Sequence, residues 1–195
     1  MLRTKEEIKK TWDKIAKEYG GYRRKPWPPI KEFLDKVDAD LLDIGSANCC
    51  YCSDILKQGH KIYAVDISAE MLKLAPKEII KIKADATKIP IKRKFKYILA
   101  KALIHHLPTE KDRIVFLKEI KRLLTNDGEA LITAWYSKEK GDKMVNWGGY
   151  KHSRYYHFFS KKELEDLLEK ANIKNFSITK SKASIKINYI IKIKN

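Results

Sequence analysis

The chain has 195 residues, 44% of them hydrophobic, which is enough for one folded domain with an apolar core. No apolar run reaches the ~20 residues that cross a bilayer, and the charged start "MLRTKEEIKKTWDK" lacks the apolar segment of a secretory signal. These features argue against a membrane or exported protein. We therefore expect a soluble, cytoplasmic protein with no membrane partner.

The formal net charge is +17, with 42 lysines and arginines against 25 acidic residues. Such a field favours partners rich in phosphate, above all nucleic acid. A lysine-rich surface is also typical of heat-adapted proteins, in which lysine and glutamate increase together. The excess of basic residues is larger than balanced ion pairing needs, so the nucleic-acid interpretation is favoured.

In chain order, apolar periodicity first predicts an amphipathic helix over 5–19, and a loop rich in glycine and proline follows at 20–29. A short helix is expected around 29–37. In the next part, strands alternate with helices. The second of these helices is expected to start at Ser68, which is its N-cap. The expected strands are "DLLDIG" (40–45), "KIYAVDIS" (61–68), "EIIKIKAD" (78–85) and "KFKYILAK" (94–101), and the helices are 51–58 and 68–75.

The second half begins with the clearest amphipathic helix, 110–124, and then gives a turn and strand in "TNDGEALITAWY". A helix over 160–171 is expected to start at Ser160, with Glu163 completing a capping box. Two final strands, "NFSITKS" and "SIKINYIIKIK", read as a hairpin. This alternation predicts an α/β, doubly wound and mainly parallel sheet with at least one antiparallel strand.

Ligands of such sheets bind at the carboxyl ends of the strands. Asp43, Asp66 and Asp85 stand at the ends of three successive predicted strands, and Gly45 follows the first. An acidic residue about 20 positions after such a turn can accept hydrogen bonds from ribose hydroxyls. Each aspartate alone could simply cap a helix, but three together favour a nucleotide-type cofactor.

Cys49, Cys50 and Cys52 are the three cysteines of the chain. They are too close together to join distant parts of a fold, and their odd number fits a reducing compartment. A metal site would need further ligands, and there is no second cysteine cluster. We interpret them as small buried side chains and expect no metal.

The stretches "LLDIGSANCCY", "IYAVDIS", "KADATKIPI" and "ALITAW" resemble the successive motifs of class I S-adenosylmethionine-dependent methyltransferases. The resemblance implies a Rossmann-like fold with a seven-stranded, mostly parallel sheet, an antiparallel C-terminal hairpin strand and helices on both faces. It implies one methyltransferase domain over 1–195, in which the N-terminal helix and the "KPWPP" loop (1–30) cap the cofactor site.

The same resemblance implies which residues contact S-adenosylmethionine. The expected cofactor-binding residues are Asp43, Gly45, Ser46, Ala47, Asp66, Ile67, Met71, Asp85, Ala86 and Ala100. Asp66 would bind the ribose, and Asp85 would reach the adenine edge. The chain departs from the family at Ala47 and Cys49, where glycine is usual. Ala47 fits if its φ stays negative, whereas Cys49 would cost about 1 kcal/mol or more in a left-handed conformation.

Three further stretches, "DKIAKEYGGYRRKPWP", "LIHHLPTEKDRIVFLKEIKRLL" and "RYYHFFSKKELEDLL", are similar to the tRNA methyltransferases that esterify a carboxymethyl group on the wobble uridine. The resemblance implies that tRNA, through its anticodon loop, is the substrate. It also suggests a small zinc-binding activator subunit as a partner. The third strand, "EIIKIKAD", is the candidate sheet edge for it, unless its lysines already protect that edge.

A carboxylate acceptor needs no general base, but it needs a cation to orient it. The candidates are Arg23, Arg24, His105, His106 and Arg154. Of the two adjacent histidines only one is expected to face the cavity, and we predict His106; the alternative is a histidine that caps a helix or lies in a loop. Arg23 matches the family's arginine before "KPWP", and a solvated or phosphate-binding arginine is the alternative.

The catalytic residues expected on these grounds are His106, Arg23, Arg154 and Tyr155. Arg154 and Tyr155 would hold substrate or stack on a base, although the tyrosines of "RYYH" could instead pack in the core. The "KRKFK" run, with Lys92, Arg93, Lys94 and Lys96, is a candidate phosphate-binding patch or a solvated turn. The candidate stacking side chains are Tyr22, Trp147, Tyr155 and Tyr156.

Two other functions stay open on the sequence alone. One is methylation of a small metabolite, because this fold serves many acceptors. The other is a catalytically silent protein that binds RNA or a partner, because Ala47 and Cys49 depart from the glycine pattern.

Overall fold

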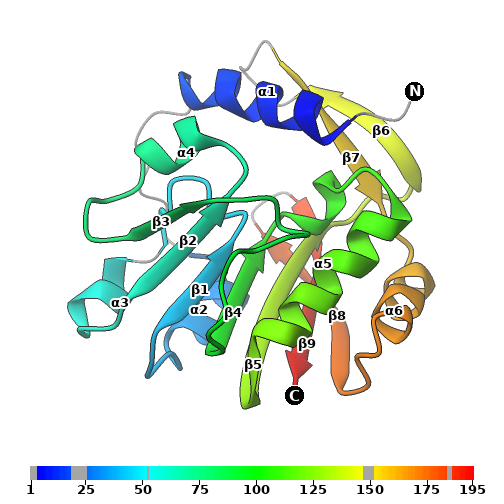
Figure 1. The fold of residues 1–195 in the computed structure, drawn as a ribbon. Coiled ribbons are helices and arrows are strands. Elements are labelled where there is room, and N and C mark those ends of the chain that lie inside the picture. Colours follow the sequence, from blue (N-terminus) through cyan, green and yellow to red (C-terminus); the bar gives the residue numbers. More distant parts are fainter. Residues whose placement is uncertain (1–3, 19–25, 52, 147–151, 184–185) are drawn as a thin grey trace.

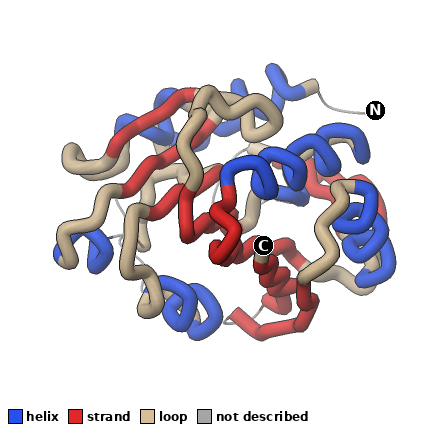
Figure 2. The backbone as a smooth tube through the Cα atoms, turned by 60° about the horizontal axis from the view of Figure 1, so that its bottom comes forward, coloured by secondary structure: helices blue, strands red, loops and turns tan. Residues whose placement is uncertain are grey.

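A computed structural model of the chain describes residues 4–18, 26–51, 53–146, 152–183 and 186–195. Its centre is a sheet of seven strands in the order β3-β2-β1-β4-β5-β9-β8. These strands are β1 (Leu41–Ile44), β2 (Ile62–Asp66), β3 (Ile80–Lys83), β4 (Phe95–Lys101), β5 (Leu124–Trp135), β8 (Phe176–Ala183) and β9 (Lys186–Lys194). Figure 2 shows the strands as a continuous band with helices on either side.

Strand β9 pairs antiparallel with both β5 and β8, whereas the remaining pairs of the sheet are parallel. One reversed strand therefore stands in an otherwise parallel sheet, and the expected Rossmann-like architecture is confirmed. Since the parallel strands point the same way, their carboxyl ends meet at one edge, where such sheets bind ligands.

The helices are α1 (Lys5–Ala16), α2 (Pro28–Leu34), α3 (Ser53–Lys57), α4 (Ala69–Lys73), the 3₁₀ turn η1 (Ile104–His106), α5 (Glu110–Leu123) and α6 (Lys161–Lys170). Apolar residues of α5 and α6 share one core cluster with the sheet, and those of α2, α3 and α4 share another. Helices thus cover both faces of the sheet, as predicted. No helix among the described residues has the length and apolar character needed to cross a bilayer.

Helix starts follow their capping residues. The Ser68 hydroxyl accepts from the backbone N–H of Met71 at 3.1 Å, and the Ser160 hydroxyl accepts from that of Glu163, also at 3.1 Å. Both predicted N-caps are therefore confirmed. The second half of the predicted capping box at Ser160 is wrong, because the Glu163 carboxylate contacts His157 Nε2 at 2.6 Å instead.

A two-stranded sheet was not predicted: β6 (Gly141–Asn146) pairs antiparallel with β7 (Ser153–Phe158). Figure 1 shows this hairpin and α1 lying together across the carboxyl edge of the main sheet. The segment "RYYHFF" is therefore a strand beside the ligand-binding edge, and not merely a lead into the last helix. Residues from β7 and α1 thereby join the strand ends in one site.

Candidate active site

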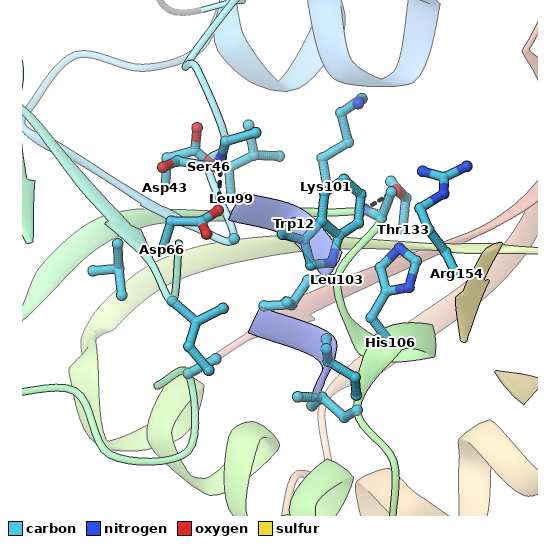
Figure 3. A pocket seen from close by; sticks show the side chains of 18 of the residues that line it. Trp12, Asp43, Ser46, Asp66, Leu99, Lys101, Leu103, His106, Thr133 and Arg154 are labelled. Atoms are coloured by element: carbon cyan, nitrogen blue, oxygen red, sulfur yellow. Dashed lines mark hydrogen bonds between the residues drawn. The ribbon is translucent and has the colours of Figure 1, made fainter. Parts of the chain in front are cut away.

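A cavity of about 450 Å³ opens at the carboxyl edge of the sheet, within the size range of small-molecule sites. Its walls come from the ends of β1, β2 and β4, from the segment after β3, and from α1, β7 and β9. Figure 3 shows Asp43, Ser46 and Asp66 on one side of it and Lys101 and Arg154 on the other. The cavity therefore has an acidic half and a basic half.

The loop after β1 is in the left-handed backbone region at three positions. The φ angles are +69° at Gly45, +48° at Ala47 and +51° at Cys49. A Cβ on Gly45 would lie 2.9 Å from Leu103 Cδ1, so both the space and the backbone require glycine there. The condition under which Ala47 would fit, a negative φ, is not met, and Ala47 and Cys49 each cost about 1 kcal/mol or more in this region.

A third non-glycine residue with a positive φ lies on the far side of the cavity. Ala102, directly after β4, has a φ of +56°. Its backbone N–H donates to the Thr133 hydroxyl at 3.0 Å, and this bond fixes the turn. Of the four non-glycine residues with positive φ in the described chain, Ala47, Cys49 and Ala102 belong to the cavity wall, and such strain tends to gather at functional sites.

Asp66 is held at the end of β2 by backbone amides. Its carboxylate accepts from the N–H of Ala47 at 2.9 Å and from the N–H of Ser68 at 2.8 Å. Desolvation at the cavity wall nevertheless raises the pKa of Asp66 to about 6. Each carboxylate oxygen keeps a lone pair toward a further donor, so the position suits a hydroxyl-bearing ligand.

The other two strand-end aspartates have different surroundings. Asp43 is buried, and the Cys49 thiol contacts its Oδ2 at 3.5 Å. Asp85 accepts from the Thr87 N–H at 2.8 Å and pairs with Lys5 Nζ of α1 at 2.9 Å. Asp85 lines the cavity, but in this conformation it also ties α1 to the sheet.

Most of the expected cofactor-binding residues are brought together here. Those that line the cavity are Asp43, Gly45, Ser46, Ala47, Asp66, Ile67, Asp85 and Ala86. Met71 and Ala100 do not belong to its lining; Met71 packs against α1 and Ala100 lies within the core of the sheet. Their side chains support the wall from behind.

His106 lines the cavity and His105 does not, as expected from the sequence. The Tyr155 carbonyl lies 2.7 Å from His106 Nδ1, so this nitrogen carries the proton and Nε2 does not. Burial, with Arg154 nearby, lowers the pKa of His106 to about 3, and burial also lowers the pKa of His105 strongly. Both histidines are neutral at physiological pH, so their expected role as orienting cations is wrong.

Among the described residues, the cations that line the cavity are instead Lys101, Arg154 and Lys186, together with Lys5 at the acidic side. Arg154 is buried, and its guanidinium carbon lies 5.3 Å from the ring centres of both Trp12 and Tyr156. Lys186 Nζ lies 3.8 Å from the ring centre of Trp135. Burial, and then the charge of Arg154, lowers the pKa of Lys186.

Tyr155 faces away from the main cavity. Its hydroxyl donates to Asp142 at 2.6 Å and accepts from Arg113 at 3.0 Å. Burial raises its pKa, so it stays protonated. The core-packing interpretation therefore fits Tyr155 better than the expected role in substrate binding, and its neighbour Tyr156 lines the cavity instead. Arg23 and Arg24, like Tyr22 and Trp147, lie outside the described residues.

Sequence reasoning missed Lys101, Lys186 and Trp12 as members of the site. Lys101 is the last residue of β4, which is a position that the strand-end rule selects. Lys186 and Asn188 are two residues apart on β9, so their side chains share one face, and both line the cavity. Which face of β9 points to the cavity is known only from the register of the strand. In a chain with 42 basic residues, no lysine stands out by its type alone.

The "KRKFK" cluster is at the wrong edge of the sheet for the expected phosphate contacts near the site. It precedes β4, whereas the cavity lies beyond the carboxyl end of that strand. Arg93 pairs with Asp40 at 3.1 Å, and Lys96 pairs with Asp38 at 2.9 Å. The alternative reading of a solvated turn therefore fits this cluster.

The cysteines form no metal centre in the described part of the chain. Cys49 is buried and Cys50 is half-buried, both as free thiols, while Cys52 lies outside the described residues. No group of three or more histidine, cysteine, aspartate or glutamate side chains is arranged to hold a metal ion in the ranges that the structure describes.

Comparison with known proteins agrees with this geometry. A family model described as "Methyltransferase domain" matches residues 42–132, which run from β1 through most of β5. The chain therefore carries a methyltransferase domain. It is 26% identical to the tRNA (carboxymethyluridine(34)-5-O)-methyltransferase of Schizosaccharomyces pombe, over 85% of the chain and 88% of the yeast protein.

A protein of the same name from Xenopus tropicalis is 29% identical over 71% of this methyltransferase, which spans only 22% of the frog protein. In three dimensions the fold is similar to an S-adenosylmethionine-dependent methyltransferase of Methanosarcina mazei. The TM-score is 0.69 at 19% identity, covering 88% of this chain and 99% of the other.

A second solved structure, the 1,6-didemethyltoxoflavin-N1-methyltransferase of Burkholderia thailandensis, also gives a TM-score of 0.69. The sequences are 18% identical, and the superposition covers the whole of this chain and 92% of the other. That enzyme was solved with 1,6-didemethyltoxoflavin and S-adenosylhomocysteine bound. Acceptors therefore differ widely among proteins that share this fold.

The cavity fits S-adenosylmethionine, the cofactor of this family. The ribose diol needs acceptors, which Asp66 offers, and the ammonium and sulfonium groups favour the acidic half formed with Asp43. The carboxylate end needs a donor, and Lys101 of the basic half can supply one; its Nζ lies 4.9 Å from the ring centre of Tyr51. The ribose, the cationic groups and the carboxylate of the cofactor can thus each be matched with a side chain of the cavity.

Proposed function

We propose that this methyltransferase acts on tRNA and esterifies the carboxylate of a carboxymethyl group on the wobble uridine. The observation that supports this most directly is the division of the cavity, in which Lys101, Arg154 and Lys186 face the acidic half. A cationic pocket beside a cofactor site suits an anionic acceptor. The net charge of +17 suits the RNA that carries it.

The acidic half would hold the cofactor. Asp66 accepts from the ribose, the left-handed loop at Gly45 leaves room for close backbone approach, and Ile67 and Ala86 supply apolar contacts. When bound, S-adenosylmethionine supplies an electrophilic methyl group, so the protein's part is positioning and electrostatics.

The basic half would orient the acceptor. Arg154 donates toward a carboxylate from a guanidinium fixed among aromatic rings, and Lys186 adds a second positive charge. An ionised carboxylate is already nucleophilic, so no side chain has to remove a proton. Neutral His106 adds shape and an unprotonated nitrogen without a third charge that would bind the carboxylate too tightly.

The N-terminal segment would cap the site and exclude water. Lys5 and Trp12 of α1 and Trp27 at the start of α2 belong to the cavity lining. Helix α1 is held by the pairs of Lys5 with Asp85 and Asp112 and by the bond from the Ser68 hydroxyl to Asp13 at 2.6 Å. Desolvation of this kind strengthens the interactions of the cations with an acceptor.

A small zinc-binding activator remains part of the proposal. Strand β3 is an edge of the sheet, as expected, and it exposes Ile80, with exposed Leu74 at the end of α4. An exposed apolar edge strand favours pairing with another chain. Of the lysines expected to protect this edge, Lys81 donates to the Ala75 carbonyl at 2.7 Å.

The test is methyl transfer from labelled S-adenosylmethionine to tRNA that lacks the ester, by the purified protein alone and with a co-expressed candidate activator. Label should enter a nucleoside with the mass of a carboxymethyluridine methyl ester, and mild alkali should release it as methanol. Ribonuclease treatment before the reaction should abolish incorporation. Alkali-stable label, or label in small metabolites only, contradicts the proposal.

A further inference from the structure

A second group of lysines and aromatic rings lies next to the cavity. Lys180 Nζ of β8 lies 3.9 Å from the ring centre of Tyr136, and Lys140 Nζ lies 4.2 Å from the same centre. Tyr189 of β9 meets the Tyr136 ring edge-on, with ring centres 5.5 Å apart. We call Tyr136, Lys140, Lys180 and Lys182 the lysine–tyrosine surface; Tyr189 is buried and supports the Tyr136 ring.

This surface is continuous with the basic half of the cavity. Tyr136 directly follows Trp135, which lines the cavity beneath Lys186. Because side chains alternate along a strand, Lys186 and Tyr189 stand on opposite faces of β9. The carboxyl edge of the sheet therefore carries lysine–aromatic contacts on both faces, one inside the cavity and one outside it.

The surroundings of the lysine–tyrosine surface are strongly basic. Lys138, Lys140, Lys180 and Lys182 are exposed. No acidic residue follows Glu169 in the sequence, so β8 and β9 contain none. Of the nearby acids, Glu139 pairs with Lys143, and Asp142 contacts Tyr155 and His157.

We propose that the lysine–tyrosine surface docks the single-stranded RNA that flanks the target base, so that Tyr136 stacks on a neighbouring base while Lys140 and Lys180 contact its phosphates. This inference rests on the proposed function. Grooves that bind single-stranded nucleic acid combine cations with aromatic platforms, because every base has a face that can stack. The lysines above Tyr136 are exposed and long, so they can move from the ring to a phosphate when a base arrives.

The opposite edge of the sheet provides a matched control. Lys92 and Lys94 are exposed and precede β4, far along the strand direction from the cavity. The double variants Lys140→Gln/Lys180→Gln and Lys92→Gln/Lys94→Gln each remove two positive charges. A general attraction of RNA to net charge would make them equivalent, whereas a docking surface would separate them.

The experiment measures the dissociation constant for tRNA over a series of salt concentrations. Lys140→Gln/Lys180→Gln should weaken binding about tenfold and make the log–log salt dependence shallower by about one to two units. Lys92→Gln/Lys94→Gln should stay within about twofold of the wild type at the same salt. Equal losses in both variants, or no loss at Lys140 and Lys180, would overturn the proposal.

A third variant tests the stacking. Tyr136→Leu should weaken tRNA binding about tenfold, as expected for one stacked base, and should leave the salt dependence unchanged. Binding of S-adenosylhomocysteine and the melting temperature report whether each variant is folded. If Tyr136→Leu is unstable, the two lysine pairs alone decide between the outcomes.

The results also separate this inference from the proposed function. Wild-type protein that methylates tRNA, with unchanged binding in Lys140→Gln/Lys180→Gln, refutes only the docking surface. Wild-type protein that binds tRNA with the expected loss in that variant, but transfers no methyl group to it, refutes only the reaction.

Discussion

The two halves of the cavity are built in different ways. The acidic half uses short aspartates at strand ends, and Asp66 is fixed by two backbone amides. The basic half uses long side chains, Lys101, Arg154 and Lys186, that lie against aromatic rings. Short side chains on strands give a rigid site, whereas the long side chains of lysines on rings can adjust to a ligand. The difference suits an invariant cofactor on one side and a flexible nucleic acid on the other.

The pKa values of Asp66 and Lys186 respond to different neighbours. A nearby cation would lower the pKa of Asp66, but that pKa is raised to about 6 by desolvation, and Asp13 adds to the rise. The pKa of Lys186 is lowered, partly by Arg154, so the cations act on one another. Figure 3 shows Leu103 between Asp66 and Arg154, with Thr133 and His106 close to Arg154. The pKa of Asp66 is thus set mainly by burial, and that of Lys186 by burial and by Arg154.

The largest expected effect is that of Asp66→Ala on cofactor binding. Loss of charge-assisted hydrogen bonds to the ribose should cost about 3 kcal/mol, or roughly a hundredfold in affinity. Isothermal titration with S-adenosylhomocysteine measures this. The Arg154→Met variant is the control and should bind the same ligand within about twofold. If both variants lose equal affinity, the two halves are not separate.

The role of the basic half is tested by the rate of the methyl transfer and not by binding of the cofactor. Arg154→Met should lower kcat/KM for tRNA methylation by about thirtyfold, which corresponds to loss of one charged contact of about 2 kcal/mol. Arg154→Lys should restore only part of this, because lysine lacks the planar fork of donors. Unchanged kcat/KM in Arg154→Met would remove the guanidinium from the acceptor site.

The affinity for the cofactor should depend on pH through Asp66 in the acidic half, and the expected change is about tenfold. With a pKa of about 6, Asp66 is mostly ionised at pH 7 and mostly protonated at pH 5, so cofactor affinity should fall about tenfold between them. The stability of the ligand-free protein should change in the opposite direction. Because the folded pKa lies above the unfolded value of 3.8, stability decreases as pH rises from about 4 to 6. Titration calorimetry and melting curves at several pH values measure both trends, and a flat affinity profile excludes Asp66 as the ribose acceptor.

The smallest expected effects concern backbone strain on the two walls. Ala47→Gly and Ala102→Gly should each stabilise the protein by about 0.5–1 kcal/mol, because relief of a left-handed alanine exceeds the entropy that glycine adds to the unfolded chain. The melting temperature should rise by about 2 °C. Ala84→Gly, at a residue without positive φ, should instead lower it. A fall in all three variants would contradict the strain assigned to the loop and to the turn after β4.

How far the sequence could predict this site differs between the halves. The acidic half was predictable because a strand end fixes where a short aspartate lies, and Asp43, Asp66 and Asp85 all line one cavity. The basic half was not, because its members come from distant segments and are lysines among many. The choice between Tyr155 and Tyr156 shows the limit: on a strand, a shift of one residue exchanges the two faces.

The fold was predicted more completely than the local backbone. Alternating strands and helices fixed the sheet and its edge strand β3, whereas the hairpin of β6 and β7 was missed because its alternation resembled a loop with aromatic residues. The φ of Ala47 could not be predicted either. A residue's conformation in a tight loop depends on tertiary contacts, here the bond from its N–H to Asp66, and not on its own preference.

Helix α1 crosses the entrance, and its first turn is anchored by Lys5 to two carboxylates, Asp85 at 2.9 Å and Asp112 at 2.7 Å. Because α1 lines the cavity, we expect spent cofactor to leave only when these ion pairs break, and added salt weakens them by screening. Under the proposed function the same salt should also weaken the binding of tRNA. Steady-state turnover should therefore pass through a maximum as potassium chloride is raised, with exchange of cofactor limiting below it and capture of RNA limiting above it.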